Sequence, residues 1–365
     1  MLQYHALRIA EKRAETERAV ALTFAVPPEL AANFRFEAGQ HLGLRLRVHG
    51  EELRRTYSIS SSPSAATLSI CVRRISGGRF SNFVGDELRV GDLVDVLMPN
   101  GSFHAGPRPG RPRLSVAIAA GIGITPVIAI VRQLLEAEPD SRVLLFYGNR
   151  DAESVLFIEE LQALKDRYVT RFGLHFLLTA ESQEIELYNG RLTAAKLDEL
   201  TPGLFDARAV DEYFLCGPGD MIESLTTALA GKGVEPGRIH AEHFLAASPA
   251  AAQSAQAGMM AGTAAAPAAR PDVARVAVLI DGRTRSFEMP MDGTSVLDAA
   301  NEAGFDLPFS CRAGVCSTCR TRLVKGKVEM HTNYALEQHE LDEGFILACQ
   351  AHPVTNDIEL TYDSR

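Results

Sequence analysis

The spacing of hydrophobic and polar positions changes along the chain. Up to about residue 108 they alternate in short runs separated by Gly and Pro, as in 42–48 and 68–72, which predicts a small antiparallel barrel. Beyond that point short apolar runs alternate with helical patterns, beginning with a strand over 114–120 and a helix from Pro126. This alternation predicts a doubly wound parallel sheet in an α/β domain.

A low-complexity stretch follows these two segments. Residues 247–270 are rich in Ala, with Ser, Gln, Gly and Pro, and show no amphipathic period. An Ala-rich helix is the alternative, but Gly258 and Gly262 would interrupt it, and we expect a flexible tether. The sequence therefore predicts four parts: an antiparallel barrel over 1–108, an α/β domain over 109–246, a linker over 247–272 and a C-terminal domain over 273–365.

The C-terminal part carries a hairpin, a helix and four cysteines. An alternating strand turns at Asp281-Gly282 and returns, and a helix with Ser295 at its start follows. Gly314, within the cysteine loop, lets the backbone approach a bound group closely. The cysteines have the spacing C-x4-C-x2-C with a distant fourth member, which is the plant-type pattern for a [2Fe–2S] cluster; they are Cys311, Cys316, Cys319 and Cys349.

Other uses of these cysteines stay open. A four-thiolate zinc site is one, although zinc sites usually pair two short knuckles, whereas one loop here carries three cysteines. Buried reduced thiols are another. The six cysteines of the chain could also form disulfides, but the metal-ligand spacing favours thiolate ligation.

Composition and charge limit the partners. The chain has 46% hydrophobic residues and a formal net charge of −9, which disfavours a nucleic acid or an anionic membrane surface. Residues 1–20 carry charges throughout and lack the apolar core of a signal peptide, and no apolar run is long enough to span a bilayer. We expect a cytoplasmic protein with a protein or small-molecule partner.

Two motifs in the barrel segment suit a flavin nucleotide. In Arg55-Thr56-Tyr57-Ser58 the aromatic ring can stack on a flavin, Arg can neutralise a phosphate and Ser can hydrogen-bond the ring edge. Alone, this motif is more simply a surface Arg beside a buried strand Tyr. Support comes from Gly77-Gly78-Arg79-Phe80-Ser81-Asn82, a Gly-rich turn that opens a helix, whose N–H groups suit a pyrophosphate.

Two further motifs suit a nicotinamide cofactor. Gly121-Ile122-Gly123-Ile124-Thr125-Pro126 joins an apolar strand to a helix, where glycines let a pyrophosphate approach backbone N–H groups. A generic tight turn is the alternative. Cys216-Gly217-Pro218-Gly219 also joins a strand to a helix. Arg150 and Arg191 favour NADPH, with NADH possible, because either Arg can equally be a solvated surface charge.

Together these motifs resemble the signature of the ferredoxin–NADP reductase superfamily, and residues 273–365 resemble plant-type ferredoxins, which implies a β-grasp fold. The resemblance implies FAD rather than FMN, with Ser58 at the reactive N5 edge of the flavin, Cys216 near the nicotinamide as a reduced thiol, and Phe244 closing over the flavin. The flavin contacts that it implies are Arg55, Tyr57, Ser58, Val72, Arg73, Gly78, Phe80 and Ser81. The nicotinamide contacts are Gly121, Gly123, Thr125, Pro126, Cys216, Gly217, Pro218 and Met221.

The order flavin, nicotinamide, iron–sulfur resembles the reductase components of multicomponent oxygenases over essentially the whole chain. Within that class the chain is similar to the reductase subunits of bacterial phenylacetyl-CoA epoxidases, in Gly50–Arg55, Gly77–Ser81, Tyr147–Arg150, Thr332–Glu337 and Leu347–Ala351. The likeness implies electron transfer from NADPH through FAD and [2Fe–2S] to a di-iron oxygenase that acts on phenylacetyl-CoA in phenylacetate catabolism.

Rival functions stay open. The chain could serve another aromatic hydroxylase, or reduce acceptors less selectively. A cluster-containing redox sensor would need a DNA-binding or signalling segment, and none is visible in the sequence. Residues 273–365 carry nine Lys and Arg against fourteen Asp and Glu, which suits docking on a basic partner face but is equally explained by solubility.

Overall fold

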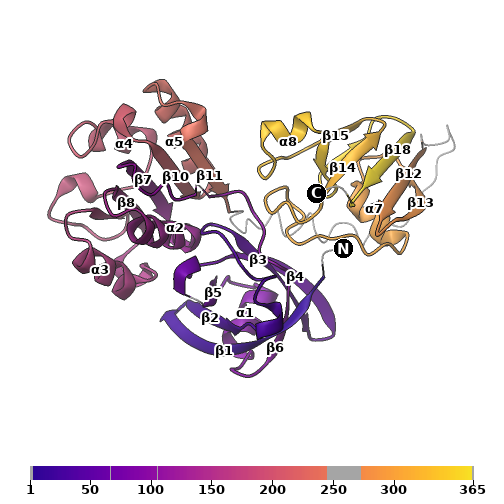
Figure 1. The fold of residues 1–365 in the computed structure, drawn as a ribbon, viewed down its shortest axis with the longest axis horizontal. Coiled ribbons are helices and arrows are strands. Elements are labelled where there is room, and N and C mark those ends of the chain that lie inside the picture. The colour runs from indigo at the N-terminus through magenta and orange to yellow at the C-terminus, as the bar shows by residue number, and fades with distance from the viewer. Residues whose placement is uncertain (1–2, 66, 105, 245–272, 364–365) are drawn as a thin grey trace. The chain divides into compact units, whose positions relative to one another are not determined.

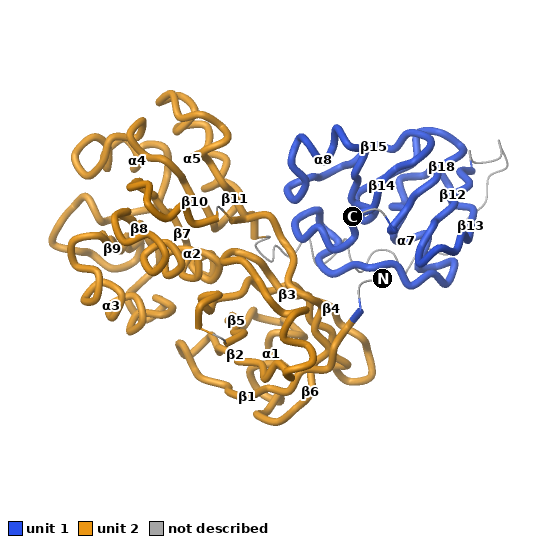
Figure 2. Tube along the Cα trace, in the orientation of Figure 1, with its two compact units in different colours: residues 1–3, 245–365 blue, residues 4–244 orange. Residues whose placement is uncertain are grey.

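The computed structural model describes residues 3–65, 67–104, 106–244 and 273–363 (Figure 1). The chain divides into two compact units, residues 4–244 and residues 245–365 with 1–3 (Figure 2). The expected linker over 247–272 lies outside the described residues. None of the described helices is long and apolar enough to cross a membrane.

The first sheet of the larger unit is antiparallel, with six strands in the order β4-β3-β6-β1-β2-β5. Alternate residues of its strands, such as Leu42 and Leu44, are buried in one core, which is what the period-two pattern predicts. Helix α1 packs against β3 and β5. The elements are β1 (His5–Thr16), β2 (Ala19–Ala25), β3 (His41–Val48), β4 (Glu51–Ser58), β5 (Leu68–Arg73), α1 (Arg79–Asp86) and β6 (Leu93–Val96).

The second sheet of this unit is parallel, in the order β11-β10-β7-β8-β9. Apolar residues of α2 and α3 pack on one face and those of α4 and α5 on the other, so the predicted doubly wound α/β fold is confirmed (Figure 1). The elements are β7 (Leu114–Ala120), α2 (Ile124–Ala137), β8 (Arg142–Asn149), α3 (Ile158–Arg167), β9 (Phe172–Leu178), α4 (Ala194–Leu200), β10 (Glu212–Gly217), α5 (Gly219–Gly231) and β11 (Ile239–His243).

The strand order of the parallel sheet reverses between β7 and β10. The chain first adds β8 and β9 on one side of β7, then returns to add β10 and β11 on the other. Ligands of doubly wound sheets bind beyond the carboxyl ends of the strands at such a reversal. The loops that follow the two strands lead away from each other there and leave a crevice between them. In this chain those loops begin at Gly121 and Gly217.

The smaller unit is a mixed sheet in the order β13-β12-β18-β14-β16, with a separate two-stranded β15-β17 ribbon. The hairpin predicted at Asp281-Gly282 is confirmed, with both residues at positive φ, and the Ser295 hydroxyl caps the following helix. The elements are β12 (Val273–Ile280), β13 (Arg283–Pro290), α7 (Val296–Glu302), β14 (Arg320–Lys325), β15 (Val328–Met330), α8 (Gln338–Asp342), β16 (Phe345–Leu347), β17 (Ala351–Pro353) and β18 (Asp357–Thr361).

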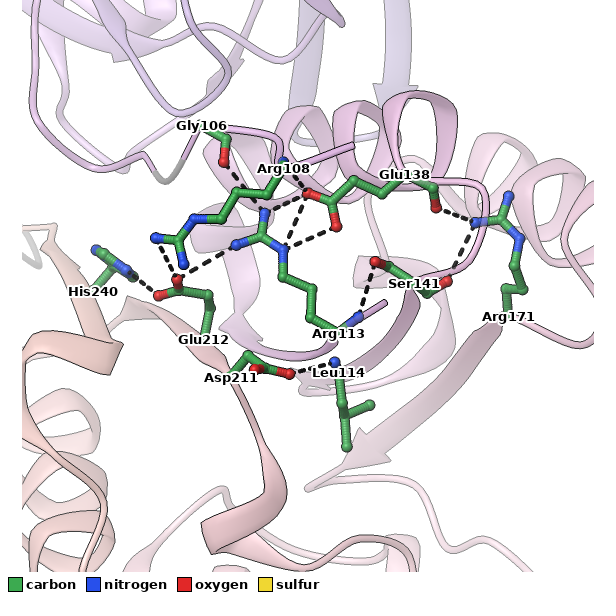
Figure 3. A network of polar contacts seen from close by, with 10 residues as sticks. All are labelled: Gly106, Arg108, Arg113, Leu114, Glu138, Ser141, Arg171, Asp211, Glu212 and His240. Carbon is green, nitrogen blue, oxygen red and sulfur yellow. Dashed lines mark hydrogen bonds and ion pairs between the residues drawn. The ribbon is translucent and has the colours of Figure 1, made fainter. Parts of the chain in front are cut away.

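A buried network of charges ties the segment after the barrel to the parallel sheet (Figure 3). The guanidinium of Arg113 donates to both carboxylate oxygens of Glu138 and lies 3.4 Å from Glu212. Glu212 also faces Arg108 at 3.2 Å and His240 at 2.8 Å. The side chains of Arg113 and Glu138 are each 1% exposed, so the pair is held where water cannot screen it. This network lies at the amino ends of β7 and β10. The carboxyl ends of the strands, where ligands of such sheets bind, lie opposite and are called the ligand edge below.

Candidate functional site

The predicted flavin residues of β4 lie at the end of that strand. Arg55 is exposed, Tyr57 is half-buried and Ser58 is buried. The ring of Tyr57 lies 5.7 Å from that of Phe80, the first-turn residue of α1. Burial raises the pKa of Tyr57, so its hydroxyl stays neutral and can act as a hydrogen-bond donor. The two separate flavin motifs are therefore brought together by tertiary packing.

The Gly-rich turn is organised by its own serine. The Ser81 hydroxyl accepts the Ile75 N–H at 3.2 Å and donates to the Gly78 carbonyl at 3.4 Å. A Cβ on Gly78 would lie 2.6 Å from the Ser81 hydroxyl, so this position requires glycine. Gly78 is the N-cap of α1 without a side-chain cap, which leaves first-turn N–H groups available to an anion.

The remaining two predicted flavin residues differ in environment. Val72 is fully buried in the barrel core, so its backbone is what it can offer to a ligand. Arg73 is exposed, and its Nη1 lies 3.1 Å from where a Cβ on Gly121 would be. Arg73 thus reaches from the barrel to the first loop of the α/β domain, and it joins the flavin motif to the nicotinamide motif.

The loop after β7 contains glycines that let other groups lie close to its backbone. Gly121 has a φ of +53°, and a Cβ on Gly123 would clash with the carbonyl oxygen of Cys216. The Tyr147 hydroxyl donates to the Gly121 carbonyl at 3.0 Å and accepts the Leu156 N–H at 3.2 Å. These two hydrogen bonds of Tyr147 fix the loop, and its glycines lie where the strand order of the sheet reverses.

Thr125 and Pro126 shape the same turn from inside. Both are buried, and the Thr125 hydroxyl donates to the carbonyl of Ile122 at 3.0 Å. Their side chains therefore set the start of α2. Arg150 and Arg191 are exposed, and Arg150 lies 3.8 Å from Asp151, whose carboxylate accepts the Ser154 N–H.

Cys216 is fully buried next to Glu242, its direct neighbour in the β10–β11 register. Burial, with the Glu242 carboxylate adding to it, raises the pKa of Cys216 well above that of an ordinary thiol. Cys216 forms no disulfide in the structure. The Ser58 hydroxyl donates to the carboxylate of Glu242 at 3.3 Å. Ser58 and Cys216 therefore meet around one carboxylate.

The remaining predicted contacts lie around this junction. Met221 is buried, and its Cε would lie 2.6 Å from a Cβ on Gly217. Pro218 is exposed and precedes α5 as its N-cap. Phe244 is half-buried and packs against the core that contains α2.

The four predicted cluster ligands are neighbours in the smaller unit. The Cys311 N–H donates to the Cys316 sulfur at 3.5 Å, and the Ala313 N–H donates to the Cys311 sulfur at 3.3 Å. A hydrogen bond with Cys311 lowers the pKa of Cys349, but the adjoining Cys319 thiol and burial outweigh it, so that pKa is raised. Crowded thiols of this kind resist ionisation together unless a cation neutralises them.

The surroundings of the cysteines also fit a bulky sulfur-ligated group. Gly314 has a φ of +75°, and a Cβ there would lie 2.6 Å from the Thr332 carbonyl oxygen. The Gln350 amide donates to the Cys349 sulfur at 3.8 Å and to the Arg312 carbonyl at 3.1 Å. Donors aimed at sulfur stabilise thiolates and tune a cluster.

The described residues contain no three His, Cys, Asp or Glu side chains that converge as a single metal ion requires. A binuclear cluster has a different requirement, because its four thiolates are shared between two irons.

Sequence reasoning missed three polar groups of the larger unit. The Tyr147 hydroxyl, near the end of β8, holds the Gly121 loop through its hydrogen bond to the Gly121 carbonyl. The side-chain nitrogen of Asn149, at the carboxyl end of β8, is buried without a hydrogen-bond partner among the described residues. An orphaned donor at the ligand edge fits a site that receives a polar cofactor. The third group is His41, which lies 3.8 Å from Glu242.

Three family models match successive parts of the chain. They are an oxidoreductase FAD-binding domain over residues 6–105, an oxidoreductase NAD-binding domain over 117–227 and a 2Fe-2S iron-sulfur cluster binding domain over 278–354. These matches agree with the three site descriptions above and supply FAD, a pyridine nucleotide and a [2Fe–2S] cluster as the cofactors.

Similar proteins match over nearly full length. One of the subunits of 1,2-phenylacetyl-CoA epoxidase from Escherichia coli K12 is 40% identical over 365 residues, 100% of this chain and 99% of that protein. The ferredoxin reductase component of 3-ketosteroid-9-alpha-monooxygenase from Mycobacterium tuberculosis is 36% identical, over 98% of this chain and 95% of that protein. Among solved structures, phthalate dioxygenase reductase matches 98% of both chains with a TM-score of 0.59 and 25% identity.

Proposed function

Because this chain belongs to the family of oxygenase reductase components that combine FAD-binding, NAD-binding and 2Fe-2S domains, we propose that it supplies electrons to the oxygenase part of a phenylacetyl-CoA epoxidase. It is an NAD(P)H-dependent oxidoreductase. The acceptor is an oxygenase component, which we take to be of the di-iron type. We place the protein in the cytoplasm, where reduced cysteines persist.

The observation that carries this proposal is the meeting of Ser58 and Cys216 around Glu242. Ser58 ends a barrel strand, and Cys216 lies at the end of the strand beside the Gly121 loop. A hydride passes between two rings only when they are in contact. A junction that carries one residue of each motif supports direct transfer between a nicotinamide and a flavin.

The chain's own residues have separate tasks in this proposal. The Gly121 loop and the start of α2 bind the dinucleotide pyrophosphate through backbone N–H groups. Tyr57 presents aromatic surface to the flavin, with the buried ring of Phe80 packed beside it, and Ser58 hydrogen-bonds the reactive edge of the flavin. The buried Cys216 excludes water and stays uncharged. When bound, FAD and the cluster supply the conversion of a two-electron donor into single electrons.

The cluster would be held in the smaller unit by its four neighbouring cysteines, Cys311, Cys316, Cys319 and Cys349. The Gln350 amide and the N–H of Ala313 stabilise the charge on the ligated sulfurs. These donors support one-electron exchange at this unit.

We infer that NADPH is preferred over NADH. Arg150 and Arg191 are both exposed and follow strands β8 and β9 at the ligand edge of the sheet. Leu192, next to Arg191, packs on Gly148, two residues before Arg150, so the two segments are adjacent. Two guanidinium groups there suit a 2′-phosphate.

An anaerobic NADPH titration of the full chain, followed by visible absorption and EPR, tests the electron path. We expect both flavin and cluster bands to bleach and a rhombic [2Fe–2S] signal to appear. Zinc in place of iron, with flavin bleaching alone, would overturn the proposal. Turnover with purified phenylacetyl-CoA epoxidase oxygenase subunits, set against steroid oxygenase subunits, tests the partner.

Coenzyme choice is tested by Arg150→Ala and Arg191→Ala, with Arg142→Ala at the opposite end of β8 as the matched control. The first two should lower kcat/KM for NADPH by about tenfold, as expected for losing one charge-assisted contact, and leave NADH unchanged. Equal losses for both coenzymes would contradict the proposed 2′-phosphate site.

A further inference from the structure

Two histidines of the smaller unit stack on each other at one end of the β15–β17 ribbon. The ring centroids of His331 and His352 lie 3.7 Å apart, and the ring planes are inclined by 22°. His352 belongs to β17, and His331 directly follows the last residue of β15. His331 is exposed and His352 is half-buried, so protons from the solvent reach the pair. The stack is therefore a titratable contact between the two strands of the ribbon.

Hydrogen bonds tie the stacked residues to their surroundings. The backbone N–H of His331 donates to the Gln350 carbonyl at 3.1 Å. Nδ1 of His352 lies 3.2 Å from the carbonyl oxygen of Thr294. Because a carbonyl only accepts, Nδ1 of the neutral ring carries its proton, and the free lone pair is at Nε2. A second proton on His352 therefore binds at Nε2.

Both strands of the ribbon reach the cysteine loop within two residues of the stack. Thr332 follows His331, and a Cβ on Gly314 would lie 2.6 Å from the Thr332 carbonyl oxygen. Gln350 lies two positions before the other histidine, and its side-chain amide donates to the Cys349 sulfur at 3.8 Å. Separation of the two rings would therefore disturb contacts that shape the cysteine loop.

We propose that the stack of His331 and His352 is a proton-sensitive clasp, which holds the ribbon on the cysteine loop while His352 is neutral and opens when His352 is protonated. Two neutral imidazoles pack face to face, whereas two imidazolium rings at this distance repel each other. Opening moves Gln350 away from the Cys349 sulfur, so acid weakens the hold of the smaller unit on its cluster. The proposal goes beyond the proposed function, because it is the same for any electron acceptor.

The groups that face His352 set the direction of its titration. Burial, and next the like charge of a protonated His331, lower the pKa of His352. The carbonyls of Thr294 and Gly293 and the carboxylate of Asp298 on α7 raise it, but they do not outweigh the first two. The neutral ring thus contributes stability above 6.5, and this contribution is lost as the pH falls from 6.5 through the lower folded-state pKa.

The other charges near the ribbon are engaged or exposed. Asp298 is paired with Arg312 at 3.1 Å. Asp292, in the turn before α7, accepts the hydroxyl and the N–H of Thr294, and these hydrogen bonds lower the pKa of Asp292. Glu329 lies opposite the second histidine in the β15–β17 register, but it is exposed, so water and salt screen its charge.

The first test follows the ring-proton titrations of His331 and His352 by NMR in the oxidised full chain. In His331→Gln the titration of His352 should move to higher pH, because the like charge of the stacked ring is gone. The matched control is His339→Gln, which removes an exposed imidazole 3.3 Å from Glu337 in the same unit and should leave His352 unchanged. A His352 titration that does not move in His331→Gln would overturn the proposal.

The second test measures how fast iron is released to a chelator, from the loss of cluster absorption without oxygen. The rate is compared at about pH 7.5 and about pH 5.5, on either side of the imidazole pKa. Acid protonates cysteine sulfurs in every variant, so His352→Asn, which has no ring to titrate, gives the baseline.

The two tests are linked by a quantitative expectation. Each unit by which NMR places the pKa of His352 below 6.5 corresponds to a tenfold change in the opening equilibrium. The acceleration by acid in the wild type, divided by that in His352→Asn, should therefore be up to tenfold per unit. Equal acceleration in both proteins would overturn the proposal. Failure of the proposed function is seen separately, in the NADPH titration near neutral pH.

Discussion

Replacing Arg113 by Met should destabilise the larger unit strongly, because Arg113 is the centre of the buried charge network (Figure 3). Its guanidinium contacts Glu138 through Nε at 2.9 and 3.1 Å, and Glu212 through Nη1 at 3.4 Å. The side chain of Glu212 is 6% exposed, and those of Arg113 and Glu138 are 1% exposed. Removing one partner of such a buried pair costs about 3–5 kcal/mol, since a charge is left without compensation.

The loss of stability in Arg113→Met should come mainly from Glu138. Glu212 keeps Arg108 and His240 as partners, whereas Glu138 keeps the Arg108 N–H at 2.8 Å. Burial by itself raises the pKa of Glu138, but the hydrogen bonds from Arg113 and Arg108 outweigh it and the pKa is lowered. Without Arg113 the pKa should rise above the unfolded value of 4.5.

The sign of the pH effect follows. In the wild type, the stability that Glu138 contributes is present above 4.5 and is lost as the pH falls through its lowered pKa. In Arg113→Met the folded state binds the proton more readily than the unfolded state. The difference in free energy of unfolding between the variant and the wild type should therefore shrink as the pH falls from about 7 towards about 5.

Urea unfolding followed by circular dichroism, with FAD in fixed excess, measures this cost. The control is Arg74→Met, which removes an exposed partner of Asp86 at 2.6 and 2.7 Å and should cost under about 1 kcal/mol. Equal losses of unfolding free energy in the two variants, or a loss in Arg113→Met that does not change with pH, would refute the reasoning.

Three further outcomes are expected. Gly314→Ala should lower the iron and labile sulfide bound per chain, whereas Gly304→Ala, with a nearly equal φ of +76° but open space at its Cβ, should load normally. Burial, with the stacked His331 adding to it, lowers the pKa of His352 from 6.5, so the smaller unit should lose thermal stability as the pH falls through 6.5, and His352→Asn should flatten that dependence in calorimetry. Tyr147→Phe should weaken NADPH binding several-fold in titrations, because losing the hydrogen bond to the Gly121 loop costs about 1 kcal/mol, while FAD affinity stays the same.

Local pattern and spacing predicted the elements of the fold. Period-two alternation indicated the barrel strands, and apolar runs followed by glycine turns indicated the β7–α2 and β10–α5 units. The turn at Asp281-Gly282 and the cap at Ser295 depend on neighbours within a few residues, which is why the sequence alone identifies them. The spacing of the cysteines predicted their joint use for the same reason.

The start of a helix is hard to predict where two local signals compete. Helix α3 begins at Ile158 and not with the apolar run at Val155, because Asp151 and Ser154 cap a short 3₁₀ turn first and Phe157 adopts a positive φ. The division of the chain at residues 108, 246 and 272 stays a prediction, as do the individual contacts of the three cofactors.

Tertiary structure alone decided which groups share a site. Glu242 is 184 residues from Ser58 in sequence, and no local pattern links it to Ser58 or to His41. The link arises because β11 pairs with β10 in parallel, which sets Glu242 beside Cys216 at the sheet edge that faces the barrel. Sequence determines residue types and short-range geometry, whereas contacts across sheets depend on strand order and packing, and these are properties of the whole fold.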